Sequence, residues 1–148
     1  MKLAEALAGV ARVLLDTAPV VYHLEGNPRY GSLMQEFFRV AADGGVLLVT
    51  TPITLAECLV HPIRRGLTEL TAAYSRLIVE GERTEFRPIG SVEASAAARL
   101  RAEHNLTLAD SLQAAVALQA GCQGILTNDP AFKCVQQVRP LILDELEP

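Results

Sequence analysis

Residues 107–132 read TLADSLQAAVALQAGCQGILTNDPAF, and the order of features in this stretch indicates the architecture of the chain. Its first part, 107–120, is apolar on nearly every side, which predicts a helix buried against a sheet. Glycines at 121 and 124 end this helix. The short apolar run 124–127 then predicts a strand that leaves through a tight turn at Asn128-Asp129-Pro130. A buried helix that leads directly into a buried strand is typical of an α/β domain.

Two earlier stretches place a short apolar run directly before a helix. Arg12–Asp16 (RVLLD) predicts a buried strand that ends in an acid and leads into a helix. Val46–Thr50 (VLLVT) predicts a second buried strand, and both Thr51 and Thr54 fit the start of the helix that follows it. Strands and helices therefore alternate along the chain.

The remaining segments continue this alternation. The sequence predicts helices over 32–42, 67–78 and 92–103, a brief proline-containing edge strand over 86–89, and a last short strand over 141–143. Parallel strands need crossover connections, and those crossovers bring helices. We therefore expect a single three-layer α/β domain over 12–148, with a mainly parallel sheet of about four to five strands flanked by helices. Residues 1–11 are expected to be a loose N-terminal extension.

Length and composition favour one globular domain. The chain has 148 residues, of which half are hydrophobic and a fifth charged, and this is enough to bury an apolar core without disulfides. Its three cysteines are widely spaced and form no CxxC pair, which favours a reducing cytoplasm over a disulfide framework or a zinc site. Charged residues interrupt the N-terminal apolar runs, so we expect no signal peptide and no membrane span.

The overall charge does not favour broad binding of nucleic acid. A formal net charge of -4 gives little attraction for phosphate, unless the acids gather in one pocket where bound cations reverse the local sign. The three histidines share no metal-ligand spacing and are assigned no catalytic role. Candidate phosphate contacts, each equally explained by a solvated helix face, are Arg64, Arg65, Arg83, Arg87, Arg99, Arg101 and Lys133.

Four acids are expected at one edge of the sheet. Asp16 closes the first strand, Glu57 follows the second strand by one helical turn, and Asp129 follows the strand that ends at Thr127. Asp110 lies in the first turn of the buried helix, and it approaches the others only if that helix begins near the same edge. In open parallel sheets, ligands bind at the carboxyl ends of the strands.

Each acid also has a purely structural explanation. Asp16 and Asp129 could cap the elements that follow them, and the segments 54–57 and 107–110 both match a capping box. Capping does not predict that all four acids converge, because their charges would repel one another unless cations lay between them. Oxygen ligands without thiolate or clustered imidazole select Mg²⁺ or Mn²⁺, and such a site suits the cleavage of phosphodiester bonds.

Three segments carry a more specific resemblance. LLDTAPVVYHLEG at 14–26, TLAECL at 54–59 and LTLADSLQAAVALQAGCQGILTNDPAF at 106–132 resemble the PIN-domain family, especially its VapC-type toxins. The resemblance extends from Val13 to about Phe132. It implies a Mg²⁺- or Mn²⁺-dependent endoribonuclease that is the toxin of a type II toxin-antitoxin pair. It also implies a homodimer and a cognate antitoxin that occupies the active site.

The resemblance places the acidic site of the family on positions of this chain. The metal-binding and catalytic carboxylates fall on Asp16, Glu57, Asp110 and Asp129, with Thr127 and Asn128 as polar supports. One position departs from the family, which commonly has Asn two residues after the first Asp, whereas this chain has Ala18. The change removes a possible hydrogen bond near the metal and bears on catalytic efficiency more than on metal binding.

Two other readings remain open from the sequence. An aspartyl-nucleophile phosphatase also begins with an acid at the end of its first strand, but it commonly needs a second acid where Ala18 stands. A catalytically inactive PIN-like binding module would keep the fold and lack metal-dependent RNA cleavage. Nucleotide-cofactor enzymes and serine hydrolases are disfavoured, because no Gly-rich phosphate loop, GxSxG or GxGxxG motif occurs.

Overall fold

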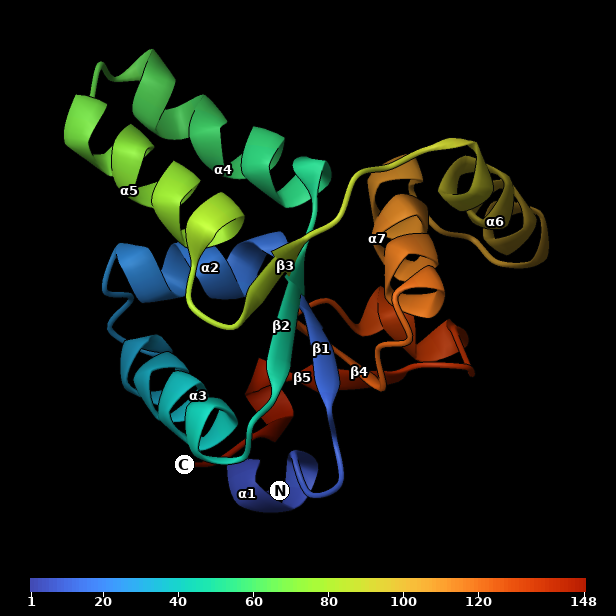
Figure 1. Cartoon of the computed structure of the whole chain (residues 1–148), viewed down its shortest axis with the longest axis horizontal. Coiled ribbons are helices and arrows are strands. Elements are labelled where there is room, and N and C mark those ends of the chain that lie inside the picture. Colours follow the sequence, from blue (N-terminus) through green and yellow to red (C-terminus); the bar gives the residue numbers. More distant parts are fainter.

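A single sheet of five parallel strands forms the centre of the molecule. The computed structural model describes all residues 1–148 and orders the strands β3-β2-β1-β4-β5 (Figure 1). Their bounds are β1 (Arg12–Leu15), β2 (Leu47–Thr50), β3 (Thr84–Phe86), β4 (Gly124–Thr127) and β5 (Arg139–Ile142). The chain builds outward from β1 to β3 and then returns to β4 on the other side of β1. Strand order therefore reverses between β1 and β4, where open α/β sheets bind ligands at the carboxyl ends of their strands.

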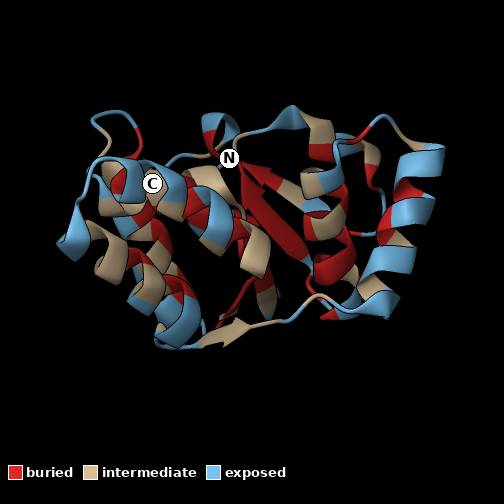
Figure 2. Ribbon diagram, turned by 90° about the horizontal axis from the view of Figure 1, so that it is seen from above, coloured by how far each residue is buried: buried red, intermediate tan, exposed pale blue.

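Helices cover both faces of this sheet, which confirms the three-layer α/β architecture predicted from the sequence. One face carries α2 (Thr17–Leu24), α3 (Gly31–Asp43), α4 (Pro52–Arg64) and α5 (Thr68–Glu80), and the other carries α6 (Ser91–Glu103) and α7 (Leu108–Gln119) (Figure 1). The central strands are buried beneath both layers (Figure 2).

Alternation along β1 divides the core into two clusters. Val13 and Leu15 pack in the cluster beneath α2 to α5, whereas Leu14 packs in the cluster beneath α6 and α7. All three side chains are at most 2% exposed. A strand buried on both faces reads as a continuous apolar run, and this is why RVLLD predicted β1 correctly.

The segment before β1 is packed against the domain rather than loose. It contains the short helix α1 (Leu3–Ala6), and Leu3 and Ala6 are buried in the core. The Leu3 N–H donates to the Glu147 carbonyl oxygen at 2.8 Å. The expectation of a loose extension was wrong in this respect, because the partner of this segment lies at the far end of the sequence.

Several element bounds differ from those expected. The edge strand β3 spans Thr84–Phe86, so it shares only Phe86 with the segment 86–89 that was expected to form it, and Pro88 lies beyond it. The last strand begins earlier than expected, at Arg139, and it accommodates Pro140 because it lies at the other edge of the sheet. Leu108, at the start of the buried helix, is 56% exposed. Two 3₁₀ helices, η1 (Pro130–Cys134) and η2 (Leu143–Glu145), flank β5.

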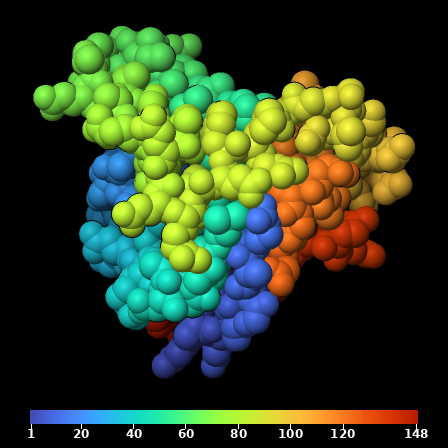
Figure 3. Space-filling model, viewed as in Figure 1, coloured from blue at the N-terminus to red at the C-terminus, as the bar shows by residue number.

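The space-filling view shows the hairpin of α4 and α5 projecting at one corner of the molecule (Figure 3). None of the helices combines the length and the apolar character needed to cross a membrane.

Candidate active site

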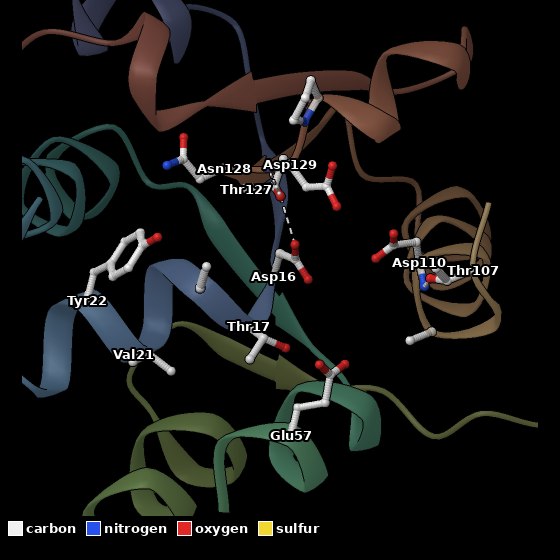
Figure 4. Close-up of a pocket in the computed structure, with 13 residues that line it drawn as sticks. Asp16, Thr17, Val21, Tyr22, Glu57, Thr107, Asp110, Thr127, Asn128 and Asp129 are labelled. Carbon is white, nitrogen blue, oxygen red and sulfur yellow. Dashed lines mark hydrogen bonds between the residues drawn. The ribbon is translucent and has the colours of Figure 1, made fainter. Parts of the chain in front are cut away.

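An open cavity of about 660 Å³ lies at the carboxyl ends of β1 and β4. Its lining includes every side chain that the sequence proposed for the site, namely Asp16, Glu57, Asp110, Asp129, Thr127 and Asn128 (Figure 4). The four acids come from four separate elements, and no Lys or Arg is among the lining residues. The structure therefore brings the predicted residues to one place, including Asp110.

Asp16 is held by two other elements and does not cap a helix. It occupies the N-cap position of α2, but its side chain makes no capping hydrogen bond. The Thr127 hydroxyl donates to its Oδ2 at 2.7 Å, and the Gln113 amide donates to its Oδ1 at 3.3 Å. Both carboxylate oxygens are thus oriented by side chains from β4 and α7, which fixes the carboxylate at the edge of the cavity (Figure 4).

Glu57 has no structural role as a cap. The N-cap of α4 is Thr51, whose hydroxyl oxygen accepts from the Thr54 N–H at 3.2 Å. The capping box proposed for 54–57 is therefore absent, and Glu57 lies in the second turn of the helix. Its side chain points into the cavity from α4 (Figure 4).

The other two acids combine local bonds with a place in the cavity. Thr107 caps α7 and accepts from the Asp110 N–H at 3.1 Å, but the reciprocal bond of a capping box is absent. Asp129 caps η1, because its Oδ1 accepts from the Ala131 N–H at 2.8 Å. The capping explanation thus holds for Asp129, holds in part for Asp110, and fails for Asp16 and Glu57.

The carboxylates affect one another electrostatically. Burial raises the pKa of the Glu57 carboxyl, and the negative charges of Asp16 and Asp110 raise it further. Burial also raises the pKa of Asp110, with Asp16 and Asp129 acting in the same direction and a hydrogen bond from Thr107 opposing them. No basic side chain lines the cavity to neutralise the four carboxylates.

The donor set fits a hard divalent cation, although the carboxylates surround the cavity rather than converge on one point. No three His, Cys, Asp or Glu side chains lie close enough together to hold a metal ion directly. The Thr17 hydroxyl oxygen is buried without a hydrogen-bond partner, and Thr17 lies between Asp16 and Glu57 in Figure 4. Carboxylate oxygens are ligands that Mg²⁺ takes, and Mg²⁺ usually keeps several waters and needs few protein ligands, so separated carboxylates can still hold it.

The sequence analysis missed a buried polar network behind Asp16. The Thr51 hydroxyl donates to Gln113 Oε1 at 2.6 Å, and Gln113 Nε2 donates to the Thr54 hydroxyl at 2.6 Å. Gln113 is 1% exposed, so these bonds satisfy an amide that would otherwise be costly to bury. One signal was available, because Gln113 interrupts an otherwise apolar run in the middle of a buried helix.

Seven of the lining residues were not proposed as site residues, and four of these lie on α2. Thr17, Val21 and Tyr22 extend the cavity along α2. Ala18 also lines the cavity. The amide that Asn would supply at this position is therefore missing from the site itself.

Comparison with known families identifies the fold. The family model described as the PIN domain matches residues 13–137, most of the chain. No curated protein matches the chain.

Several solved structures resemble the whole domain. VapBC2 from Rickettsia felis, bound to a DNA fragment from its promoter, superposes with a TM-score of 0.70 at 18% identity, over 87% of this chain and 96% of that one. VapC20 of Mycobacterium tuberculosis, described as a sarcin-ricin loop cleaving toxin, gives a TM-score of 0.68 at 16% identity, over 86% and 99%. A toxin-antitoxin complex from Klebsiella pneumoniae gives 0.61 at 19%, over 85% and 94%. At these identities the likeness establishes a shared fold.

Proposed function

The chain belongs to the PIN-domain family, and we propose that it is a Mg²⁺- or Mn²⁺-dependent endoribonuclease, the toxin of a type II toxin-antitoxin pair. The observation that carries this proposal is the convergence of Asp16, Glu57, Asp110 and Asp129 on one open cavity whose lining includes no basic side chain. Two of these acids have no capping role that would explain their position.

The four carboxylates would hold one or two divalent cations. A bound cation would supply an activated water and would neutralise negative charge that develops on the scissile phosphate. The side chains around the acids would orient the carboxylates that bind the cation. Thr127 and Gln113 hold both oxygens of Asp16, and Asp129 is tied to the same threonine, whose Oγ1 accepts from its N–H at 3.0 Å. Such supporting bonds fix the direction of a ligand before substrate arrives.

The resemblance to VapC-type toxins also implies binding partners for this chain. A cognate antitoxin and a homodimer are expected, and the solved toxin-antitoxin complex with this fold supports the antitoxin. RNA as the substrate is supported by the fold shared with the toxin that cleaves the sarcin-ricin loop. We expect the reaction to take place in the cytoplasm, where RNA and antitoxin would both be present.

The direct test is RNA cleavage with purified protein in Mg²⁺ or Mn²⁺, run beside Asp16→Ala and Asp129→Ala variants shown to be folded by circular dichroism. Cleavage that requires the cation and is lost in both variants would support the proposal. Cleavage that survives both substitutions would show that the site is elsewhere.

An inactive PIN-like module is the second candidate, and Ala18 in the cavity lining is the observation that favours it. Binding of Mn²⁺ without any cleavage of RNA would favour this module over the nuclease.

A further inference from the structure

Two stacked tyrosines lie at one end of the acidic cavity. Tyr22, on α2, lines the same cavity as the four acids. Its ring stacks on that of Tyr30, with centroids 4.6 Å apart and the planes 19° from parallel. In Figure 4 the ring of Tyr22 lies on the opposite side of Asp16 from Asp110. An aromatic surface is thus available beside the carboxylates.

The ring behind Tyr22 is fixed in place. Tyr30 is 9% exposed, and its hydroxyl donates to Asp144 and accepts from the Asn128 amide at 3.1 Å. The guanidinium of Arg29 lies 5.0 Å from the centre of the Tyr30 ring and pairs with Asp144 at 2.9 Å. A ring held in this way keeps its position when a ligand binds, so little order has to be created on binding.

The same bonds tie the stack to the acidic turn. Asn128 lies between Thr127 and Asp129, and its Oδ1 accepts from the Asp144 N–H at 3.0 Å. Tyr30 therefore contacts the segment that carries one of the acids directly. The distance between the aromatic surface and the carboxylates is set by this connection rather than by a flexible loop.

From this arrangement we propose that Tyr22, backed by Tyr30, is a stacking platform for one unpaired base of an RNA strand whose scissile phosphate lies at the four acids. The inference rests on the proposed nuclease function and names the form of its substrate. Base–aromatic stacking tolerates any base, because every base has a π face. It requires an unpaired base, because a base inside an A-form helix is covered on both faces.

Charge and size support a stacking mode over a purely ionic one. The cavity lining offers no Lys or Arg to hold a strand, so, apart from a bound cation, its side chains position a nucleotide through contacts other than ion pairs. Its volume of about 660 Å³ lies within the range of roughly 300–1,000 Å³ that is common for small-molecule sites. One nucleotide can therefore occupy it beside the acids.

Fluorescence can test the contact without cleavage. The chain has no Trp, so Tyr22→Trp introduces a single indole at the proposed contact. In a Glu57→Gln background, which slows turnover and keeps an oxygen ligand, a single-stranded oligoribonucleotide in Mg²⁺ should quench this indole. A strand of equal length made of abasic sugar-phosphate units, and a blunt RNA duplex, should not. Equal quenching by the abasic strand, or RNA binding seen by anisotropy without any quenching, would overturn the platform.

Kinetics provide the second measurement, with Tyr22→Phe as the matched control that retains the aromatic ring. Tyr22→Leu should raise KM for single-stranded RNA about 5- to 150-fold, the loss expected for one base–aromatic stack, and should leave kcat within a few-fold. Tyr22→Phe should behave as the wild type. An unchanged KM in a folded Tyr22→Leu protein that still cleaves RNA would refute the platform and leave the nuclease proposal intact. Quenching of the Tyr22→Trp indole by single-stranded RNA, without any cleavage of RNA by the wild type, would support the platform and refute the nuclease proposal.

Discussion

Two clusters of charged side chains are associated with the sheet, and they differ in how their charges are balanced. In one, Glu85 on β3 pairs with Arg12 on β1 and with Arg87, and hydrogen bonds from Arg12 and then Arg87 lower the pKa of its carboxyl. In the other, the acids of the cavity have no basic partner among the lining residues, and the pKa values of Glu57 and Asp110 are raised. The first cluster joins two strands. The second retains repulsion that folding alone does not require, which is typical of a functional site.

The largest expected effect separates the two clusters by activity. Asp16→Ala should reduce metal-dependent RNA cleavage by about 100-fold or more, because it removes a ligand that Thr127 and Gln113 hold in place. Glu85→Ala should leave the rate per folded molecule nearly unchanged. Both rates are measured at saturating Mg²⁺ on proteins of matched helical content. A similar loss in both variants would show that the clusters do not differ in function.

The next effect concerns the network behind Asp16. Gln113→Leu should weaken Mn²⁺ binding by about 10- to 100-fold, because Asp16 loses one of its two orienting donors. Isothermal titration calorimetry measures this affinity without reference to turnover. Gln119→Leu is the matched control, since Gln119 lies on the same helix and is exposed. An unchanged affinity in Gln113→Leu would limit its role to packing.

A smaller effect tests the paired cluster. Arg12→Ala should lower the free energy of unfolding by about 1 kcal/mol, since the Arg12 and Glu85 side chains are 29% and 34% exposed and solvent screens the ion pair. Arg12 also donates from Nε to the Ala120 carbonyl oxygen at 2.7 Å, which adds to the loss. Urea unfolding measures this difference, and Arg39→Ala, at an exposed pair on α3, provides a control with a smaller expected change.

The smallest expected effect is a gain in stability rather than a loss. Asp110→Asn should stabilise the metal-free protein by about 1 kcal/mol or less, because it removes one of the mutually repelling charges. Thermal unfolding in a chelator measures the gain, which should shrink when Mg²⁺ is added. A variant less stable than the wild type at neutral pH would contradict this account.

The pH dependence of stability should distinguish the clusters as well. The folded-state pKa of Asp110 and of Glu57 is raised, so their stabilising contribution is complete below the unfolded pKa and is lost as pH rises through the folded one. Glu85 has a lowered pKa, and its contribution is lost as pH falls through that value. Asp110→Asn should therefore gain stability only toward neutral pH. Glu85→Gln should be less stable than the wild type near neutral pH, and its stability should approach that of the wild type in acid.

Features encoded locally in the sequence were predicted well. The strands β1, β2 and β4 are continuous apolar runs ended by polar or turn residues, and α7 is an apolar run ended by glycine. The placement of Asp16, Glu57 and Asp129 at one edge followed from the direction of parallel strands. These predictions needed no information about contacts between distant segments.

Features created by tertiary contact were not predictable in this way. Thr51 and Thr54 both fit a helix start in the sequence, but only Thr51 is the cap, and the packing of α4 against α7 makes both of them partners of Gln113. The stack of Tyr22 on Tyr30 depends on how the chain turns between α2 and α3. Residues 1–11 were expected to be a loose extension before the first strand, because the sequence does not show that Leu3 contacts Glu147.

The meeting of the two chain ends has a practical consequence for handling the protein. The Met1 amino group donates to the Glu145 carbonyl oxygen at 3.0 Å, and the backbones of Lys2 and Glu147 form an isolated parallel β-bridge. The two ends lie beside each other near α1 (Figure 1), and the neighbouring Asp144 N–H donates to Asn128 Oδ1 in the cavity lining. An affinity tag or fluorescent fusion at one end would therefore lie beside the other end. A short linker could also join the ends in a circular permutant opened at the exposed turn around Gly66.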